Sequence, residues 1–354
     1  MSALEAPAAE RLSAELLDSF FGPRAADVDA ARIDVREGIA YLGEGGFVEA
    51  GLERSIDVVS RIARSDLTSA FSAWAHRMAS WYVGLAPDGA PLRELLPDLR
   101  SGRVLGATAL ASATAHYLSG ASLPVTFREA DGAIHLSGRV PWASNLLPPF
   151  VAVTAAADAT DPRRAIVVAF TDATPGVTLA PYPDLLALQA TGSTSILLDE
   201  AGVPAGYVVS RDLTAFTESV LGPFLLLQSA FCEGLAARAL AEAATNLAGP
   251  TGPALRPNAD TAAAALDDAA RRLRELAPRA DRPERLPVPV RDLLEIRLRL
   301  ANLATDAVRL ELASAGGRGY LRASPTARRL REAAFLPIQA PTEVQLRWTL
   351  SQSA

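Results

Sequence analysis

The sequence contains no lysine, because all 34 of its basic residues are arginine. Without a lysine amine the chain cannot form a Schiff base, anchor pyridoxal phosphate or complete a Walker-type phosphate loop. A single cysteine, Cys232, excludes an internal disulfide. The three histidines, His76, His116 and His135, lie too far apart in the sequence to predict a metal site. These absences exclude several large classes of enzyme.

Basic runs and long apolar runs are also missing. The formal net charge is −6, and no cluster of arginines marks a surface for nucleic acid. No uninterrupted apolar run reaches the ~20 residues that a membrane helix needs. The first residues lack the basic start and apolar core of a signal peptide. We therefore expect a soluble, cytoplasmic protein with no nucleic-acid or membrane partner.

What the chain does have is apolar material. Hydrophobic residues make up 49 % of its 354 residues, and charged residues make up 21 %. This charged fraction lies slightly below the usual quarter, which indicates a large buried surface. At roughly 150 residues per domain, the length suggests two or three structural units.

The spacing of apolar residues changes twice along the chain. Residues 1–102 and 213–354 repeat apolar positions every three or four residues, as helices do. Residues 103–212 instead hold short β-rich runs, two of which meet at the hairpin dipeptide Asp131-Gly132. The sequence thus predicts an α+β fold with three domains in these ranges. They are an N-terminal helical domain, a middle β-barrel or sandwich and a C-terminal four-helix bundle.

Turn-forming residues predict boundaries inside these domains. Asp199-Glu200 and the Gly202-Val203-Pro204 turn are expected to separate two strands. The stretch 248–260, rich in Gly and Pro, is expected to break the helical pattern, and the proline-rich stretch 278–290 is expected to be a linker.

Several short motifs follow one another in a recognisable order. The strand-like run SGRVPWASN ends at Asn145, GGRGY covers 316–320, and an Ile-x-x-x-Thr step joins Ile338 to Thr342. Together with the helix–sheet–helix order, these motifs resemble the acyl-CoA dehydrogenase superfamily over nearly the whole chain. In that family FAD lies between the β domain and the C-terminal bundle.

The resemblance implies a set of residues around FAD. A tryptophan covers the flavin in the family, and a hydroxyl near it contacts N5, which implies these roles for Trp142 and Ser144. Leu110, Ala111 and Ser112 match the end of a strand in the family, and the resemblance implies that backbone groups there and at the glycine-rich turn contact the cofactor. The implied cofactor-binding residues are Leu110, Ala111, Ser112, Trp142, Ala143, Ser144, Gly316, Gly317 and Thr342.

The resemblance also implies a substrate and partners. The expected substrate is an acyl thioester or a related small molecule, and the expected pocket residues are Tyr117, Phe224, Tyr320 and Ala340. Family members usually form oligomers, which implies a homodimer or homotetramer. Electrons would pass to an electron-transfer flavoprotein or come from a flavin reductase.

The expected catalytic base is missing. Dehydrogenation of an acyl thioester needs a base for the α-proton while the flavin takes the hydride. Much of the family keeps a glutamate where this chain has Ala340, and the alternative position in some relatives falls on Phe224. Glu343, Glu218 and His116 are weak substitutes.

The residues that would hold the adenine half of FAD are also altered. Arg256 is the only cation near the family's Arg-x-x-Phe-Gly position, and Ala313 replaces a usual glutamine. FAD is therefore weakly held, supplied already reduced, or absent. Three functions stay open: an acyl-thioester dehydrogenase with an atypical base, a monooxygenase using reduced flavin and O2, and a non-catalytic partner subunit.

Overall fold

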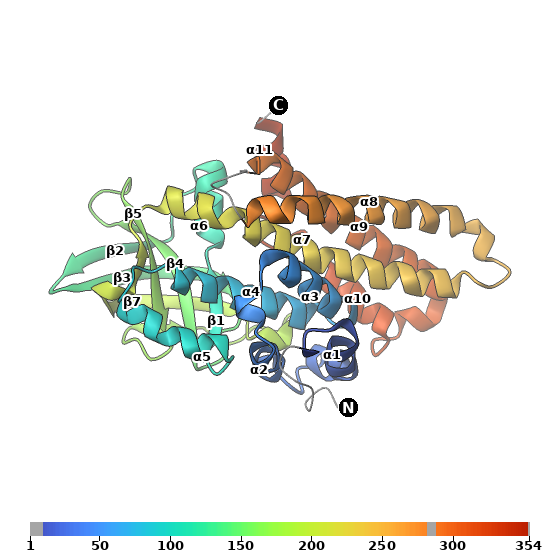
Figure 1. Ribbon diagram of the computed structural model, residues 1–354, viewed down its shortest axis with the longest axis horizontal. Helices are drawn as coiled ribbons and strands as arrows, with labels where there is room; N and C mark the ends of the chain where they lie inside the picture. Colours follow the sequence, from blue (N-terminus) through green and yellow to red (C-terminus); the bar gives the residue numbers. More distant parts are fainter. Residues whose placement is uncertain (1–9, 282–287, 353–354) are drawn as a thin grey trace.

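The computed structural model describes residues 10–281 and 288–352, and it places a sheet between two groups of helices. Figure 1 shows the sheet at one end of an elongated molecule and the long C-terminal helices at the other. The N-terminal helices pack beneath the junction of these two parts. The predicted α+β fold, with helical N- and C-terminal regions around a central sheet, is confirmed.

The N-terminal helices cover one side of the junction. They are α1 (Ala14–Asp29), α2 (Arg36–Glu44), α3 (Leu52–Ser65), α4 (Leu67–Gly84) and α5 (Leu96–Arg100). Helix α4 is buried along almost its whole length. Asp66 caps it, because its carboxylate accepts hydrogen bonds from the backbone N–H groups of Thr68 and Ser69. The cap fixes where α4 begins, between the sheet and the bundle.

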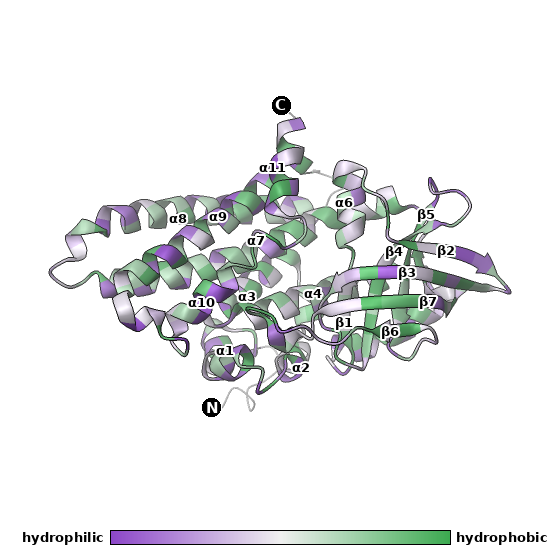
Figure 2. Cartoon of the chain, turned by 180° about the vertical axis from the view of Figure 1, so that it is seen from behind, coloured by the Kyte–Doolittle hydropathy of each residue, from purple (hydrophilic) through white to green (hydrophobic). Residues whose placement is uncertain are grey.

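In the described residues, eight strands form one sheet. They are β1 (Leu105–Ala109), β2 (Val125–Ala130), β3 (Ala133–Ala143), β4 (Phe150–Asp158), β5 (Ala165–Thr171), β6 (Val177–Leu179), β7 (Thr194–Pro204) and β8 (Val208–Ser210). The order is β6-β7-β3-β2-β4-β5-β8, and β1 pairs with β4 in parallel. Figure 2 shows β7 mostly hydrophobic, whereas the outer end of the β2–β3 hairpin is hydrophilic.

The hairpin turn was predicted correctly. Asp131 and Gly132 both have positive φ values, 52° and 75°, and they join β2 to the antiparallel β3. A type I′ turn requires positive φ at both central residues, which Asp-Gly tolerates well. This hairpin carries β3 back to the junction, where the motif ending at Asn145 lies.

Three predicted boundaries were wrong. β7 runs through Asp199 to Pro204 as one strand, because Glu200 adopts a φ of 49° at a register irregularity and does not end the pairing. β1 ends at Ala109, and Ala111 already begins α6 (Ala111–Ser119). The helix α8 begins at Arg256, inside the expected break, since Pro257 fits the first turn of a helix.

Helices α7 (Leu213–Asn246), α8 (Arg256–Ala280) and α9 (Val290–Ala315) pack against one another, and α10 (Pro325–Ala333) and α11 (Glu343–Gln352) follow. α7 is long and apolar enough to cross a membrane, yet 94 % of its most apolar window is buried inside the protein. At Gly234 an added Cβ would lie 2.0 Å from the carbonyl oxygen of Ser60. Glycine therefore permits the close contact between α7 and α3.

Short 3₁₀ helices complete the chain: η2 (Phe47–Glu49), η3 (Pro91–Leu95), η4 (Gln189–Thr191), η5 (Ala205–Tyr207), η6 (Gly252–Ala254) and η7 (Gly316–Tyr320). The predicted linker at 278–290 coincides in part with the end of α8 and the start of α9, and its residues 282–287 lie outside the described residues. The predicted domain limits fall between α5 and β1 and between β8 and α7.

Candidate functional site

A crevice of about 560 Å³ lies where β3, α4, α7 and the C-terminal segment meet. Most of its exposed lining is apolar. Its walls are formed by Phe71, Trp74, Ala75, Thr108, Ala111, Trp142, Ala143, Ser144, Leu185, Leu186, Ala187, Leu188, Ser193, Phe224, Arg331, Ala334, Phe335, Ile338, Gln339, Ala340, Thr342 and Gln345. A cleft of this size and polarity is typical of a cofactor or small-molecule site.

Aromatic side chains form one wall of the crevice. The Phe71 and Trp74 ring centroids lie 5.2 Å apart on α4, and Phe335 packs edge-on against Phe71 at 5.0 Å. Phe224 of α7 packs edge-on against Trp74 at 5.1 Å, and its carbonyl oxygen accepts a hydrogen bond from the indole Nε1. These contacts fix a rigid apolar surface that excludes water from this side.

The end of β3 supplies the opposite wall. Trp142 is 58 % exposed, which is unusual for so large an apolar side chain. Asn145 holds this strand end in place: its amide donates to the carbonyl oxygens of Ser72 and Gly106, and it accepts from the Ser72 hydroxyl at 2.6 Å. Asn145 is thus a structural residue, and it positions the exposed indole.

A chain of three hydroxyl groups starts at Ser144. Thr191 donates its only hydroxyl hydrogen to the carbonyl oxygen of Leu188 at 2.8 Å. It therefore accepts from Ser193 at 2.6 Å, and Ser193 in turn accepts from Ser144 at 2.6 Å. Because each hydroxyl has one hydrogen, Ser144 keeps only acceptor lone pairs for a ligand in the crevice.

The C-terminal segment forms the third wall. Gln228 of α7 donates to the carbonyl oxygen of Ala340 at 3.0 Å. Thr342 and Gln345 form a reciprocal capping box: the Thr342 N–H donates to Gln345 Oε1 at 2.8 Å, and the Gln345 N–H donates to Thr342 Oγ1 at 3.3 Å. The cap begins α11 directly beside the crevice and holds Ala340 at its edge.

The crevice lining contains no general base among the described residues. Arg331 is its one ionisable side chain, and it forms an ion pair with Asp29. Glu343 does not line the crevice and pairs with Arg347 on the same helix. The other two weak candidates, Glu218 and His116, also lie elsewhere.

Glu218 and His116 both form hydrogen bonds outside the crevice. Glu218 accepts a hydrogen bond from the Tyr117 hydroxyl at 3.4 Å. His116 Nδ1 contacts the carbonyl oxygen of Ala121 at 2.7 Å, and the ring lines a different hollow, near Arg211. No described group of three or more His, Cys, Asp or Glu residues could hold a metal ion.

The structure brings most of the expected residues together. The crevice contains Ala111, Trp142, Ala143, Ser144, Phe224, Ala340 and Thr342. It does not contain Leu110, Ser112, Tyr117, Gly316, Gly317 or Tyr320. Leu110 turns into a small apolar hollow beside Phe216, and Tyr320 is 82 % exposed. Leu110, Ser112, Tyr117 and Tyr320 thus lie outside the lining of this crevice, and their contacts with a flavin or substrate stay predictions.

Sequence reasoning missed the aromatic wall, the loop 185–188 and Gln339. Phe71 and Trp74 were visible as an aromatic helix face, but such a face usually belongs to the core. Gln339 lies inside the C-terminal signature without a spacing that distinguishes it. The Gln339 side chain accepts a hydrogen bond from Arg297, which lies 42 positions earlier in the sequence.

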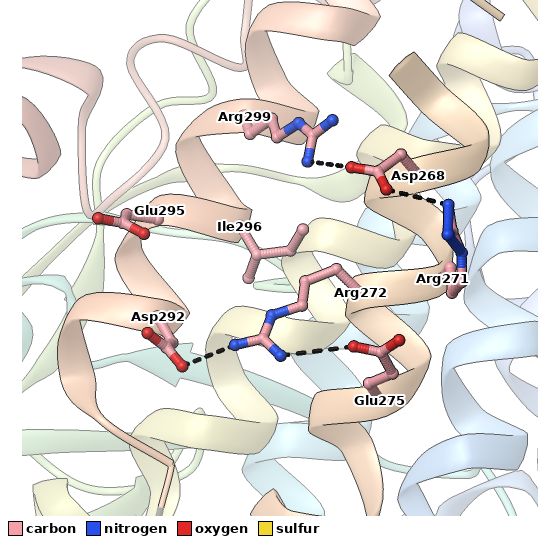
Figure 3. Close-up of a pocket in the computed structure, with 8 residues that line it drawn as sticks. All are labelled: Asp268, Arg271, Arg272, Glu275, Asp292, Glu295, Ile296 and Arg299. Atoms are coloured by element: carbon pink, nitrogen blue, oxygen red, sulfur yellow. Dashed lines mark hydrogen bonds and ion pairs between the residues drawn. The ribbon is translucent and has the colours of Figure 1, made fainter. Parts of the chain in front are cut away.

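A second hollow, between α8 and α9, has a different character (Figure 3). Its arginines and acids pair with each other, as Arg272 does with Asp292 and Arg299 with Asp268, both at 2.8 Å. Partly exposed pairs of this kind contribute about 0–1 kcal/mol each. This hollow is a solvated polar surface, and the crevice is the better candidate site.

No family model and no curated protein matches the chain. Solved structures do match it. The glutaryl-coenzyme A dehydrogenase glutaryl-CoA complex aligns with a TM-score of 0.87 at 17 % identity, covering 98 % of this chain and 93 % of that chain. Butyryl-CoA dehydrogenase from Megasphaera elsdenii aligns at 0.86 and 18 %, covering 97 % and 96 %. PigA with FAD and proline aligns at 0.81 and 14 %, covering 96 % and 97 %.

Proposed function

Because the chain has the fold of the acyl-CoA dehydrogenases, we propose that its crevice binds a flavin and oxidises a small organic substrate without a protein base. The lining of the crevice carries this proposal. Ala340 stands where much of the superfamily keeps a glutamate, and Arg331 is occupied by Asp29. Oxygenation with reduced flavin and O2 is compatible with a crevice that lacks a base, because this reaction needs no carboxylate to remove an α-proton.

The residues of the crevice suit a flavin in shape and polarity. Trp142 offers an exposed indole, and small side chains at Ala111 and Ala143 leave room beside it. Ser144 offers only an acceptor. At N5, the flavin atom that the family resemblance implies for it, an acceptor matches the N–H of reduced flavin and not the bare nitrogen of oxidised flavin. The hydroxyl chain therefore supports binding of the reduced form.

The adenine half of FAD has little to hold it in a single chain. Arg256, the one cation near the family's binding position, donates to the carbonyl oxygen of Leu247 at the end of α7. A weakly held cofactor fits a protein that receives reduced flavin from a separate reductase. A flavin reductase is thus our proposed partner, and the proposed assembly is a homo-oligomer that supplies further contacts.

In this proposal the protein binds the flavin, orients the substrate beside it and shields both from bulk water. When bound and reduced, the flavin supplies two electrons to O2, so that one oxygen atom enters the substrate and the other leaves as water. The wall of Phe71, Trp74, Phe224 and Phe335 excludes bulk water. Ser144 would accept a hydrogen bond from a ring N–H of the bound flavin through its free lone pairs.

Dehydrogenation of an acyl thioester is the second candidate, and the alignment with the glutaryl-CoA complex favours it. It would need a base from outside the crevice lining, and Glu343 and Glu218 are held in other contacts. A non-catalytic role has less support, because the crevice is open and protein side chains do not fill it.

One set of measurements separates these functions. The purified protein is mixed with FAD and a flavin reductase with NADH, and the incorporation of ¹⁸O from ¹⁸O2 into candidate substrates is followed. In parallel, FAD-loaded protein is mixed anaerobically with butyryl-CoA. Incorporation of ¹⁸O supports oxygenation, and anaerobic bleaching of the flavin supports dehydrogenation instead. A protein that cannot be loaded with either form of FAD contradicts both.

The Ser144→Ala variant tests the acceptor itself. Loss of one hydrogen bond should weaken binding of dithionite-reduced FAD by about three- to tenfold, with a smaller effect on oxidised FAD. Ser137→Ala, on an exposed part of β3, is the matched control. Equal effects on both redox forms would contradict the acceptor role.

A further inference from the structure

Gln339 has a buried amide donor without a partner. The residue is 5 % exposed and lines the crevice. Within the described chain, its Nε2 has no hydrogen-bond partner, whereas its Oε1 accepts from Nη2 of Arg297 at 2.9 Å. Leaving a buried donor unsatisfied costs about 1–3 kcal/mol. A ligand acceptor in the crevice would remove this cost.

The orientation of this amide follows from chemistry. A guanidinium group has only donors, so the oxygen of Gln339 must face Arg297 and the NH2 group must lie on the other side of the amide. The same contact prevents the amide from flipping. Gln339 therefore has an amide donor of fixed position that no described residue accepts from, on a side chain that lines the crevice.

Arg297 adds a buried positive charge behind the amide. Its side chain is 0 % exposed, and its contacts are Oε1 of Gln228 at 2.9 Å, Oε1 of Gln339, the carbonyl oxygen of Leu336 at 3.4 Å and Sγ of Cys232 at 3.7 Å. Every one of these partners is neutral, since burial raises the pKa of the Cys232 thiol although Arg297 opposes this.

The described residues provide no carboxylate that pairs with Arg297. A buried charge without a counter-ion costs several kcal/mol in a folded protein. Its field favours negative charge nearby, and Gln339 is the one of its four hydrogen-bond partners that lines the crevice. The unpaired charge and the unpaired donor thus favour the same occupant, an oxygen that carries negative charge.

We propose that Nε2 of Gln339 donates a hydrogen bond to a negatively polarised carbonyl oxygen of the crevice ligand, with Arg297 as the residue that positions and polarises the amide. Two sources have this chemistry: a carbonyl of the reduced flavin ring and the carbonyl of an acyl substrate. The flavin source depends on the function proposed above, and the acyl source does not require flavin binding.

Three variants test the proposal in the full-length protein. Gln339→Glu keeps an acceptor for Arg297 but replaces the crevice donor by an acceptor. Gln339→Met removes both groups at similar volume. Gln228→Met is the matched control, because it also removes an Arg297 acceptor but no amide donor that lies unpaired at the crevice. Binding of oxidised FAD, dithionite-reduced FAD and butyryl-CoA is measured by titration, together with thermal unfolding.

We expect Gln339→Glu to unfold at or above the wild-type temperature and to bind one probe at least about tenfold more weakly. Gln228→Met should lose stability and keep its probe affinities within about threefold. Weaker binding of reduced FAD places the acceptor on the ring. Weaker binding of butyryl-CoA alone places it on the substrate.

Two results would overturn the proposal. One is a wild-type protein that binds a probe while both Gln339 variants bind every probe as tightly as the wild type does. The other is a wild-type protein that binds none of the probes, which would also overturn the proposed function. A wild-type protein that binds butyryl-CoA in a Gln339-dependent way but never FAD would contradict only the flavin function. If Gln339→Met fails to fold, Gln339→Glu still decides the question.

Discussion

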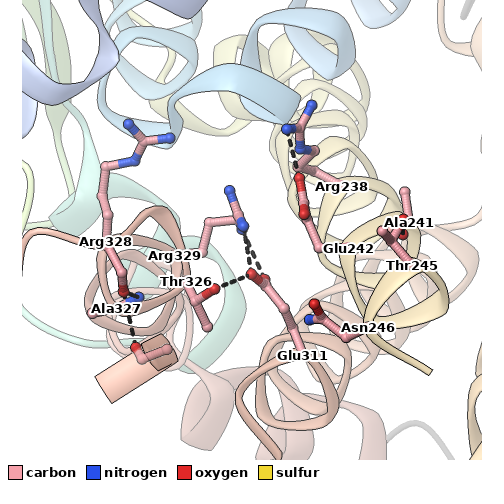
Figure 4. Close-up of polar contacts among 12 residues, drawn as sticks. Arg238, Ala241, Glu242, Thr245, Asn246, Glu311, Thr326, Ala327, Arg328 and Arg329 are labelled. Atoms are coloured by element: carbon pink, nitrogen blue, oxygen red, sulfur yellow. Dashed lines mark hydrogen bonds and ion pairs between the residues drawn. The ribbon is translucent and has the colours of Figure 1, made fainter. Parts of the chain in front are cut away.

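Arg329 of α10 and Glu311 of α9 form an ion pair in which both side chains are almost fully buried (Figure 4). Nε of Arg329 donates to Oε2 of Glu311 at 2.8 Å, and a second contact joins Nη2 to Oε1. The Thr326 hydroxyl donates to the same carboxylate at 2.6 Å. This network fixes α10, and with it the segment that leads to Ala340.

We expect Glu311→Ala to lower the free energy of unfolding by about 3–5 kcal/mol, because it leaves the Arg329 charge buried and unpaired. Urea denaturation measures the loss. Glu295→Ala is the control, since Glu295 pairs with Arg291 at the surface and should cost about 0–1 kcal/mol. Equal losses of unfolding free energy for the two variants would show that the buried ion pair stabilises the protein no more than the surface pair does.

Glu332 makes stability depend on pH in the neutral range. Burial raises its pKa to about 8, against the opposing charge of Arg328, whereas the unfolded value is 4.5. The folded protein holds this proton more tightly, so the free energy of unfolding should fall as pH rises from about 4.5 to 8.

Glu332→Gln should remove this part of the pH dependence. We expect the variant to be more stable than the wild type at pH 8, by at least the ~1.4 kcal/mol that corresponds to one pKa unit. At pH 4 the two proteins should differ little. Denaturation curves at both pH values test this, and parallel profiles across the range would refute a protonated Glu332.

His76 has the opposite effect. Burial lowers its pKa from 6.5 to about 4, although the hydrogen bond from Nε2 to the carbonyl oxygen of Leu99 at 2.8 Å opposes this. Nδ1 accepts the Gly106 N–H at 2.9 Å, so the folded protein holds the neutral ring. The unfolded chain takes up the proton first, so stability should fall as pH drops from 6.5 to 4.

The effect of His76 on stability is best measured in the Glu332→Gln variant, because Glu332, whose titration acts in the opposite direction, is absent there. We expect the unfolding free energy to decrease by at least about 1.4 kcal/mol between pH 6.5 and 4. Adding His76→Gln should make that decrease smaller, although the double variant is less stable overall. An unchanged slope would mean that His76 is not the responsible group.

Trp142→Ala tests the exposed wall of the crevice. The variant should bind FAD about tenfold more weakly, because it loses the aromatic surface, and its stability should change by less than about 1 kcal/mol. Trp348→Ala is the matched control, since Trp348 is 47 % exposed but lies outside the crevice. Fluorescence titration with FAD gives both affinities, and equal values would exclude Trp142 from the site.

Parts of the fold and site could be predicted from local sequence. The Asp131-Gly132 hairpin followed from the positive φ that its turn demands. Trp142 and Ser144 both line the crevice, since they lie in one short motif at the end of β3. The course of β7 through Glu200 could not be predicted, because cross-strand pairing with β3 outweighed a local turn signal.

The sequence by itself determined the helix–sheet–helix order, the absence of lysine chemistry and the alanine at position 340. Only the tertiary structure decided that the described lining of the crevice holds no carboxylate, and that Arg297 pairs with Gln339 and with no carboxylate of the described residues. The physical reason is that composition and periodicity are local properties. Burial and the pairing of charges depend on which distant residues packing brings together.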